Sequence, residues 1–538
     1  MLTGATLVFL VASHSLLLVQ QAQALSLKVH KHHRPATTNS ARSLNPHNST
    51  GTGRRQLAAR LDPEPLDLDN AYDLYYSTDL TIGGQQLSVQ LDTGSSELWV
   101  RPGNAFTAIQ AQVSTNSLSI RYGIGSFTGN ITTADVVMGD ITIPKQSFLT
   151  YTTGAIDNVF KAGLDGMLGL GFDDGSHVHT TVSRNGGGDS GRTLLSNFFV
   201  NNPEQPKTMS FAMSRLNDGT DDDGLFMIGE PEPEYAAVKT QPAHPLRIND
   251  TPGDFQRWAL YLDAIEINGK NITGLQSVVK GAPAGKLVAN IDTGTSLGWM
   301  PAAAVDAIYK DVPGAVYFSE TDQYTVPCMT QLRLAFWFDG VRYPMHPLDV
   351  TRVGQSKPDA DGNRQYLCTN AFVHMAALAG QTATLDLQLG DSFLRNVISQ
   401  YDFGDLTDAK TANIRMLTTV PDELAAMNDF LQVRAKQIGV AAPAPVTELP
   451  GGTIAGGTPT TSATATSTGT TMTIDPTDAP APTEVPGTPE QDPASDGNNS
   501  DGSTPETNTP SDTGAASSLA PHLSAAVVLL SSLALALW

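Results

Sequence analysis

Cysteine is scarce in this chain, which has only Cys328 and Cys368 among 538 residues. Two thiols exclude a four-cysteine zinc site, and neither they nor the histidines show the spacing of metal ligands. If the chain is secreted, an even pair predicts one disulfide, worth about 3 to 4 kcal/mol on the chain-entropy model. The composition therefore predicts neither a metal site nor a bound cofactor.

Charge is absent from the first 24 residues, and acidic residues are absent from the first 60. Within the uncharged part, the apolar run 7–19 is followed by Ala22-Gln23-Ala24, a pattern typical of a secretory signal and its cleavage site. We therefore expect residues 1–24 to be a signal peptide, although no basic residue precedes the apolar run. A buried N-terminal helix is the alternative.

Residues 25–60 carry seven Lys or Arg, whereas all 54 acidic residues of the chain follow Arg60. The remainder therefore has 25 basic residues (32 minus 7) against 54 acidic ones, a formal charge of −29. A basic segment attracted to an acidic body should loosen as carboxylates become protonated. We expect residues 25–60 to be an inhibitory prosegment that is cut after Arg55 or Arg60, with a disordered leader as the alternative.

Basic and aromatic residues are also absent from residues 441–513, where Thr, Pro, Ser, Gly and Ala dominate. Such a segment cannot bury enough apolar surface to fold, so we expect a Ser/Thr/Pro-rich stalk. Residues 514–538 contain small residues, a short spacer and a terminal apolar run, which is typical of a glycosylphosphatidylinositol (GPI) attachment signal. Gly514 is the expected attachment residue, with Asp512 and Ser517 as neighbouring possibilities. A buried C-terminal helix is the other interpretation.

Between these ends, helical periodicity is rare and short alternating runs of apolar and polar residues are common, which favours a β protein. The clearest runs are residues 87–91, 136–138, 141–143, 209–213 and 385–389. One helix is expected over residues 422–437, behind the start signal Pro421. The Gly- and Asp-rich stretches 173–191 and 217–224 are expected to be surface loops.

The tripeptide Asp-Thr-Gly occurs twice, beginning at Asp92 and, 200 positions later, at Asp292. Each copy follows an apolar run in a similar context, which indicates a duplication at the scale of a lobe, with lobes at residues 61–246 and 247–440. In each turn the Gly amide can donate to the Asp carboxylate, and the Thr hydroxyl can bond across to the other lobe. Two carboxyls held face to face cannot both ionise cheaply, so they would share one proton.

Further motifs make the chain resemble the pepsin-like aspartic endopeptidases, and in particular the fungal yapsin-type members that carry a cell-surface anchor. Residues 122–129, Tyr-Gly-Ile-Gly-Ser-Phe-Thr-Gly, are similar to the flap hairpin of that family. Residues 165–171 and 389–395 resemble the two hydrophobic-Gly segments that pass beside its catalytic loops. The resemblance covers about residues 69–418. It implies an all-β, bilobal pepsin-like fold, in which two related β-rich lobes enclose the active-site cleft.

The resemblance also assigns roles to single residues. Asp92 and Asp292 are expected to be the catalytic pair, which would activate a water for attack on a peptide carbonyl at acid pH. The supporting residues expected around the pair are Thr93, Gly94, Ser95, Thr293, Gly294 and Thr295, with Ser95 and Thr295 donating to the outer carboxylate oxygens. The flap residues expected to contact substrate are Tyr122, Gly123, Ile124 and Gly125, with Tyr122 bonding toward Trp99.

Passage through the secretory pathway would expose several acceptor sites for N-glycosylation. Sequons of the chain include those that begin at Asn130, Asn249, Asn271 and Asn498. The expected location is the extracellular face of the plasma membrane or the cell wall, with the chain held there by its GPI anchor. The expected partners are peptide or protein substrates and the membrane, without nucleic acid, and the expected state is a monomer.

The chain departs from the family pattern because its first lobe contains no cysteine, whereas many members have a disulfide loop there, close to Trp99. Substrate preference is therefore open, and Glu97 and the loop 221–223 are candidate acids for binding basic substrates. A catalytically silent relative that binds peptides is one alternative function, although both Asp-Thr-Gly copies are intact. A structural wall glycoprotein is another, but it leaves the folded middle unexplained.

Overall fold

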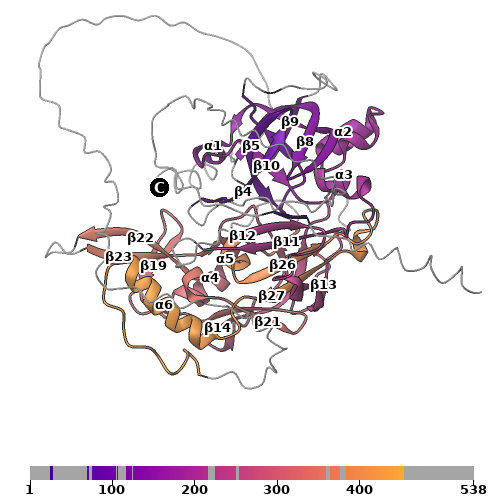
Figure 1. The fold of residues 1–538 in the computed structure, drawn as a ribbon. Coiled ribbons are helices and arrows are strands. Elements are labelled where there is room, and N and C mark those ends of the chain that lie inside the picture. Colours follow the sequence, from indigo (N-terminus) through magenta and orange to yellow (C-terminus); the bar gives the residue numbers. More distant parts are fainter. Residues whose placement is uncertain are drawn as a thin grey trace, which may run out of the picture. The chain divides into compact units, whose positions relative to one another are not determined.

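The computed structural model describes the two predicted lobes and short segments next to them (Figure 1). The described residues are 25–27, 69–71, 75–103, 106, 117–123, 125–215, 224–249, 254–358, 364–375 and 383–452. The predicted signal peptide, nearly all of the prosegment, the stalk beyond residue 452, Ile124, the loop 221–223, Asn498 and Gly514 lie outside them. None of the helices within these ranges is long and apolar enough to cross a membrane.

The first lobe contains an eight-stranded sheet whose strand order is β3-β4-β5-β10-β6-β9-β8-β7. Its strands are β3 (Asp69–Ala71), β4 (Tyr75–Ile82), β5 (Gln85–Asp92), β6 (Leu98–Val100), β7 (Ser117–Tyr122), β8 (Gly125–Met138), β9 (Ile141–Ala155) and β10 (Gly166–Gly169). The predicted runs 87–91, 136–138 and 141–143 are strands, because their apolar positions alternate into the core. Parallel pairing of β10 with β5 places Gly169 opposite Asp92.

The second lobe contains a similar eight-stranded sheet, with the order β21-β20-β14-β16-β25-β17-β24 and with β15 paired to β14. Its strands are β14 (Ala259–Ile267), β15 (Lys270–Asn271), β16 (Leu287–Ile291), β17 (Gly298–Met300), β20 (Leu334–Phe338), β21 (Val341–Pro344), β24 (Phe372–His374) and β25 (Leu387–Leu389). A separate four-stranded sheet has the order β18-β19-β23-β22. Its strands are β18 (Val316–Phe318), β19 (Gln323–Pro327), β22 (Thr351–Pro358) and β23 (Arg364–Asn370).

A six-stranded sheet with the order β1-β12-β11-β26-β27-β13 combines strands from both halves of the chain. Its strands are β1 (Leu25–Leu27), β11 (Thr208–Met213), β12 (Gly224–Ile228), β13 (Ala243–Pro245), β26 (Val397–Asp402) and β27 (Asn413–Thr418). At one edge, β1 from the predicted prosegment pairs antiparallel with β12, with Leu25 opposite Ile228. This sheet joins the two lobes through backbone hydrogen bonds.

Helices are few and short in the described part of the chain. They are α1 (Asp157–Lys161), α2 (His177–Arg184), α3 (Leu194–Asn201), α4 (Ala302–Tyr309), α5 (Asp391–Leu394) and α6 (Glu423–Gln437), with 3₁₀ turns η1 (Asp173–Gly175), η2 (Gly188–Gly191), η3 (Ala236–Thr240), η4 (Pro347–Asp349) and η5 (Ala409–Thr411). The expected helix over 422–437 is confirmed as α6, and its cap Asp422 accepts from two backbone amides. The expectation of a loop over 173–191 is wrong, since α2 and two 3₁₀ turns occupy it.

Apolar side chains from both lobes form one continuous buried cluster. Trp258 lies at the junction, where its ring packs 4.6 Å from that of Phe172 and its indole N–H donates to the carbonyl of Leu170 (3.1 Å). A second cluster in the first lobe surrounds Trp99 and Phe127, whose ring centroids are 4.7 Å apart. The all-β, two-lobed fold class is therefore confirmed, and its core fixes the loops that leave the central strands.

Candidate active site

The two Asp-Thr-Gly turns leave equivalent strands of the two large sheets. Asp92 ends β5, which is paired in parallel with β10, and Asp292 follows β16, which is paired in parallel with β25. The register repeats: β10 places Met167 opposite Gln90, and β25 places Gln388 opposite Asn290, which follows Gln90 by 200 positions. The duplication inferred from sequence is thus visible in the strand pairing.

The threonines of the two turns tie the lobes together. The Thr93 hydroxyl donates to the carbonyl of Ile291 (2.9 Å), and the Thr293 hydroxyl donates to the carbonyl of Leu91 (3.0 Å). Each hydroxyl also accepts from the backbone N–H of the opposite threonine, at 3.0 Å in both directions. All four bonds are buried, so the relative position of the two turns is fixed at a point where water does not compete.

The glycines bring the two carboxyl groups face to face. A Cβ atom on Gly94 would collide with the carboxyl group of Asp292, and one on Gly294 would collide with that of Asp92. Neither glycine has a positive φ, so the requirement at both positions is space and not backbone freedom. Any larger residue at 94 or 294 would push the opposite aspartate away.

Hydrogen-bond donors surround both carboxyls, which are 5% and 3% exposed. Asp92 accepts from the Gly94 amide at Oδ1 (2.8 Å) and from the Ser95 hydroxyl at Oδ2 (2.5 Å). The same pair of bonds serves Asp292. Its Oδ1 accepts from the Gly294 amide (2.9 Å) and its Oδ2 from the Thr295 hydroxyl (2.8 Å). The supporting residues expected from sequence therefore all contact the pair or its turns.

Burial and, second to it, the charge of the nearby Asp292 raise the pKa of Asp92 to about 8, against the opposing effect of bonds from Ser95 and Gly94. A hydrogen bond between the two carboxyls also favours the protonated form of Asp92. At neutral and acid pH the pair therefore holds at least one proton. One protonated and one ionised carboxyl in contact can serve as an acid and a base at once.

The predicted flap is the hairpin of β7 and β8, where Tyr122 pairs with Gly125 across the turn. Gly123 is exposed at the tip, Gly125 has a φ of +143°, and Ile124 lies outside the described residues. Burial of the Tyr122 hydroxyl, together with the charge of Asp92, raises its pKa well above its usual value. Although Ser95 and Trp99 lie beside this hydroxyl, it has no regular hydrogen-bond partner among the described residues.

Glu97 was a candidate for binding basic substrates, and the structure contradicts that role. Its side chain is 3% exposed and accepts from the amides of His177 and Val178 (3.2 Å to Val178) and from the Ser176 hydroxyl (3.0 Å). These donors are the cap and first turn of α2, where a negative charge is favoured. Burial nevertheless raises the pKa of Glu97 to about 7. Glu97 therefore anchors the N-terminus of α2 to the segment that follows the first Asp-Thr-Gly turn.

Cys328 and Cys368 form the predicted disulfide, with Cα atoms 4.8 Å apart. It joins the residue after β19 to strand β23 in the four-stranded sheet, and both half-cystines are buried. Among the sequons, Asn271 is exposed on β15, whereas Asn130 and Asn249 are half-buried.

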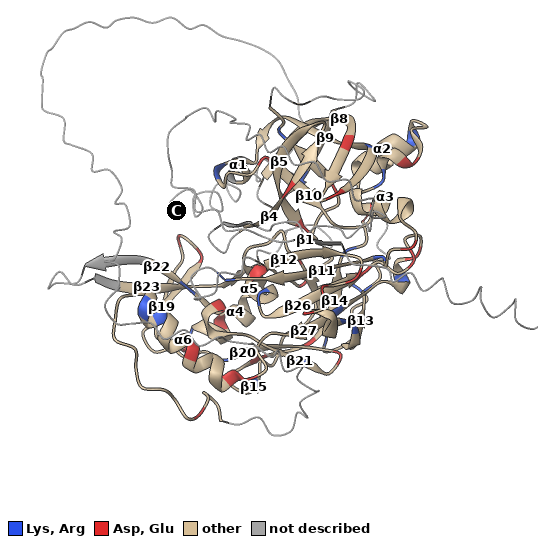
Figure 2. Ribbon diagram, in the orientation of Figure 1, with Lys and Arg blue, Asp and Glu red and all other residues tan. Residues whose placement is uncertain are grey.

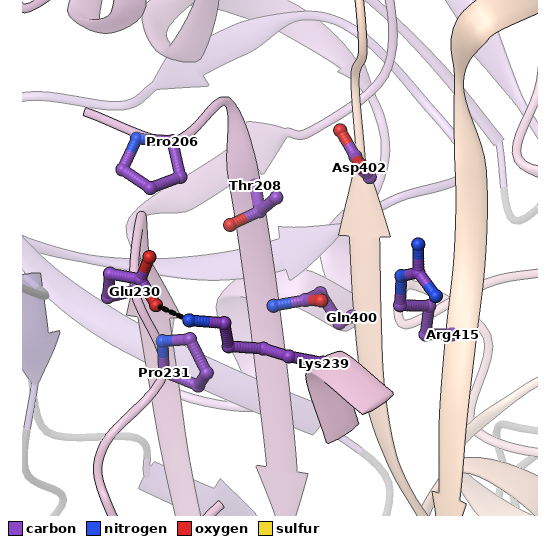
Figure 3. Close-up of a pocket in the computed structure, with 8 residues that line it drawn as sticks. All are labelled: Pro206, Thr208, Glu230, Pro231, Lys239, Gln400, Asp402 and Arg415. Atoms are coloured by element: carbon purple, nitrogen blue, oxygen red, sulfur yellow. Dashed lines mark hydrogen bonds and ion pairs between the residues drawn. The ribbon is translucent and has the colours of Figure 1, made fainter. Parts of the chain in front are cut away.

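One cavity of about 220 Å³ lies on the six-stranded sheet (Figure 3), and no residue of either aspartate turn lines it. Its lining comes from β11, β26, β27, η3 and their neighbours. Lys239 is paired there with Glu230 (2.5 Å), and Arg415 donates to the carbonyl of Gln241 (2.6 Å). Lys239 and Arg415 are thus already bonded within the chain, and we assign the cavity no role in the chemistry of the aspartate pair.

Comparison with known proteins gives the class that this fold and site define. The sequence model of the family described as eukaryotic aspartyl protease matches residues 75–409. The chain belongs to the eukaryotic aspartyl protease family, and its paired Asp-Thr-Gly turns have the arrangement of an aspartic-type endopeptidase.

Several curated relatives are similar over the same region. The aspartic-type endopeptidase ctsD of Aspergillus fumigatus is 28% identical over 64% of this chain and 66% of its own length, so the chain spans slightly less than two thirds of that relative. Vacuolar protease A of the same organism is 27% identical over 63% of this chain and 79% of its own. Pepsin A of Sus scrofa is 27% identical over 66% and 85%. Among solved structures, the aspartic proteinase from Irpex lacteus matches with a TM-score of 0.48 and 20% identity, covering 65% of this chain and 95% of that one.

Sequence reasoning missed one polar contact of the pair. Gln388 of β25 donates from Nε2 to Asp292 Oδ2 (2.6 Å) and to Thr295 Oγ1 (3.2 Å). The only sequence signal was a polar residue between two leucines immediately before Gly390, in a strand that alternates anyway. Strand pairing, and not spacing along the chain, brings Gln388 beside Asp292.

Proposed function

We propose that this chain hydrolyses peptide bonds with a water molecule activated between Asp92 and Asp292. The observation that carries the proposal is the contact of two buried carboxyls, each held by the amide of its own turn and facing the glycine of the other. Family membership supports the same activity. The expected substrates are peptides and proteins.

The reaction needs one protonated and one ionised carboxyl. The ionised member takes a proton from water as its oxygen bonds to the peptide carbon, while the protonated member gives its proton to the carbonyl oxygen. The resulting diol then returns one hydroxyl proton to the member that had lost its proton, the other member protonates the nitrogen, and the C–N bond breaks. The products are a carboxylic acid and an amine, and the pair again holds a single proton.

The hairpin of β7 and β8 supports this chemistry as the proposed flap. Tyr122 ends β7 next to the first turn, and its ring is stacked on that of Phe127, with centroids 6.3 Å apart. A hairpin with glycines at its tip can bend over an extended peptide, offer backbone hydrogen bonds and exclude water from the reacting bond. Tyr122, Gly123, Ile124 and Gly125 are its proposed substrate-contacting residues.

Acid pH is the proposed working range. The singly protonated pair loses its remaining proton as the pH rises through the pKa of Asp92, so activity should fall as the pH rises through about 8. An inhibitory prosegment over residues 25–60 fits the same picture, since its strand β1 extends the six-stranded sheet. Cleavage after Arg55 or Arg60 would separate β1 from the mature chain.

Secretion and anchoring complete the proposal. Residues 1–24 as signal, 441–513 as stalk and 514–538 as GPI signal, with attachment at Gly514, would display the enzyme at the plasma membrane or cell wall in the manner of yapsin-type proteases. Charged residues of both signs are spread along the elements of both lobes in Figure 2, so the net charge of −22 does not by itself locate a subsite for basic substrates.

The deciding experiment first incubates the full-length chain and its variants at acid pH, where the prosegment should be released, and then digests a peptide library between pH 3 and 8. Asp92→Asn and Asp292→Asn should fold and be displayed, yet lose activity by at least about 10²- to 10⁴-fold, because each removes half of the proton exchange. Asp189→Asn is the matched control, since Asp189 is a 74% exposed carboxylate paired with Arg192. Wild-type chain without activity would favour a silent peptide-binding relative, and substantial activity in either pair variant would overturn the mechanism.

A further inference from the structure

Met167 and Gln388 occupy equivalent positions beside the two aspartates. Met167 lies opposite Trp99 in the antiparallel β10–β6 pairing, and Gln388 lies opposite Trp299 in the β25–β17 pairing. Each tryptophan follows its aspartate by seven positions. The duplicated architecture therefore presents one side chain from the same strand position to each carboxyl, and the two side chains differ in chemistry.

The first-lobe side chain offers no donor. The sulfur of Met167 lies 3.8 Å from the Ser95 hydroxyl, the group that donates to Asp92. In the second lobe, the amide of Gln388 donates directly to Asp292 Oδ2 (2.6 Å) and to the Thr295 hydroxyl oxygen (3.2 Å). Asp292 thus accepts from three donors of its own lobe, and Asp92 accepts from two.

The two acceptors also determine which end of the Gln388 amide faces the pair. The Thr295 hydroxyl donates its hydrogen bond to Asp292 Oδ2, so its oxygen can only accept a hydrogen bond from Gln388. An NH₂ group satisfies both Asp292 and Thr295 in this position. A reversed amide would set its carbonyl oxygen against a carboxylate oxygen and a hydroxyl oxygen without a free proton, which is repulsive.

We propose that Gln388 is a positioning residue that holds Asp292 as the ionised member of the pair and leaves the shared proton on Asp92. A donor to a carboxylate stabilises its charged form, and Gln388 supplies such a donor to one aspartate only. This inference rests on the proposed endopeptidase function. The two Asp-Thr-Gly turns alone do not distinguish which aspartate is the base and which is the acid. The proposal assigns these roles: Asp292 takes the proton from water, and Asp92 protonates the peptide oxygen.

The other groups that face the pair do not create this asymmetry. Tyr401 on β26 and Tyr122 on β7 both lie near the pair. Burial raises the pKa of each phenol, so both stay neutral. The charge of Asp391 of α5 further raises the pKa of Tyr401. The carboxylate of Glu97 accepts hydrogen bonds from the cap and first turn of α2. The residues opposite Gln388 in the sheet, Asn290 and Trp299, carry no charge. No described basic side chain is bonded to either aspartate of the pair.

The proposal predicts different responses of the two limbs of the pH profile. The acid limb of kcat/KM reports the first proton lost by the pair, and the alkaline limb reports the second. Loss of the Gln388 donor destabilises ionised Asp292 in both the singly protonated and the unprotonated pair. The acid limb should therefore move to higher pH, and the alkaline limb should stay in place.

The test measures kcat/KM from pH 2 to 9 against one cleavable peptide, using the full-length chain after incubation at acid pH to release the prosegment. The variant is Gln388→Met, which gives the second lobe the side chain of the first. We expect the midpoint of the acid limb to move to higher pH by about one unit, because one charge-assisted hydrogen bond to the ionised carboxylate is lost. Met167→Leu is the matched control, because it alters packing at the equivalent position without changing a donor, and both limbs should stay fixed. Met167→Gln, which offers Asp92 a matching amide, should instead lower the alkaline limb.

Limb positions do not depend on the amount of active enzyme, so partial misfolding leaves the test intact, and Gln388→Leu repeats it with a shorter apolar side chain. If the acid limbs of Gln388→Met and Gln388→Leu coincide with that of the wild type, the proposed role of Gln388 is overturned. The endopeptidase function would still stand. An equal shift of both limbs would also overturn it, because that result shows a general change of the site. Wild-type chain that cleaves no peptide at any pH would instead overturn the proposed function.

Discussion

Thr93 and Thr293 exchange hydrogen bonds across the two lobes: each hydroxyl oxygen accepts from the backbone amide of the other at 3.0 Å. Both side chains are buried, and each hydroxyl donates in turn to the carbonyl that precedes the opposite aspartate. The bonds therefore set the spacing of Asp92 and Asp292 directly, one residue away from each. Stability and catalytic geometry depend on the same four contacts.

Replacing Thr93 or Thr293 by Val should destabilise the protein and impair catalysis together. Each substitution leaves a buried amide and a buried carbonyl without partners, at about 1 to 3 kcal/mol for each group. Urea unfolding should show this loss, and kcat should fall because the carboxyls separate. Thr240→Val is the control, since that hydroxyl makes an exposed bond to the carbonyl of Ala237. A stable Thr93→Val variant with unchanged kcat would contradict the proposed coupling.

A second prediction concerns stability in acid. Burial alone would raise the pKa of Asp349, but the charges of Arg215 and Arg395 outweigh it and hold the pKa at about 2. Both arginines contact the carboxylate, at 2.7 Å and 2.8 Å from their Nε atoms. Because the folded pKa lies below the unfolded value, the stabilisation is complete above about pH 4 and is lost as the pH falls through about 2. The ion pairs would therefore keep the fold stable over most of the proposed acid working range.

Asp349→Asn should therefore cost about 3 to 5 kcal/mol at pH 5, because it leaves the buried guanidinium of Arg395 and the half-buried one of Arg215 without their carboxylate. The difference from wild type should shrink toward pH 2, where the wild-type carboxylate also becomes protonated. Thermal unfolding at a series of pH values measures both effects. Asp189→Asn, which removes an exposed ion pair with Arg192, should change stability by less than about 1 kcal/mol at every pH. A pH-independent loss in Asp349→Asn would show that packing, and not charge, is responsible.

Local patterns predicted the elements whose stability is local or whose burial alternates. The strands around residues 87–91 and 136–138 follow from period-two alternation, and α6 follows from its start signal Pro421 and its apolar spacing. The disulfide followed from the cysteine count alone. The contact between the two aspartates followed from the duplicated tripeptide, because the same tripeptide at the end of equivalent strands places the aspartate of each lobe at an equivalent position.

Contacts between distant segments escaped prediction. Helix α2 has only eight residues in a Gly- and Asp-rich stretch, and the carboxylate of Glu97, 80 positions earlier, binds its first amides. The same bond converts Glu97 from a candidate surface acid into a buried cap. Gln388 reaches Asp292 across a parallel strand pair and 96 positions of sequence. No spacing rule along the chain carries such information.

Tyr122 offers a prediction about the flap that follows from an absent bond. Its hydroxyl is buried beside Ser95 and Trp99 without a regular hydrogen-bond partner among the described residues, whereas its ring stacks on Phe127. Tyr122→Phe should therefore keep kcat/KM within about tenfold of wild type, since little hydrogen-bond energy is lost. Tyr122→Ala should lose much more, because it removes the ring that covers the first turn. Steady-state kinetics on one peptide at its optimum pH measures both, and an equal loss in the two variants would assign the role to the hydroxyl.

Exposure separates the predicted glycosylation sites. Asn271 lies exposed on β15, whereas Asn130 is half-buried between β7 and β9, and the amide nitrogen of Asn249 donates to the carbonyl of Phe255 (2.7 Å). A glycan must project into solvent, so among the described sequons Asn271 is the one we expect to be modified. Endoglycosidase treatment should increase the mobility of the wild-type chain, and the shift should shrink in Asn271→Gln but not in Asn130→Gln. Stability of Asn271→Gln should stay within about 0.5 kcal/mol of wild type, since the exposed amide supports no core contact.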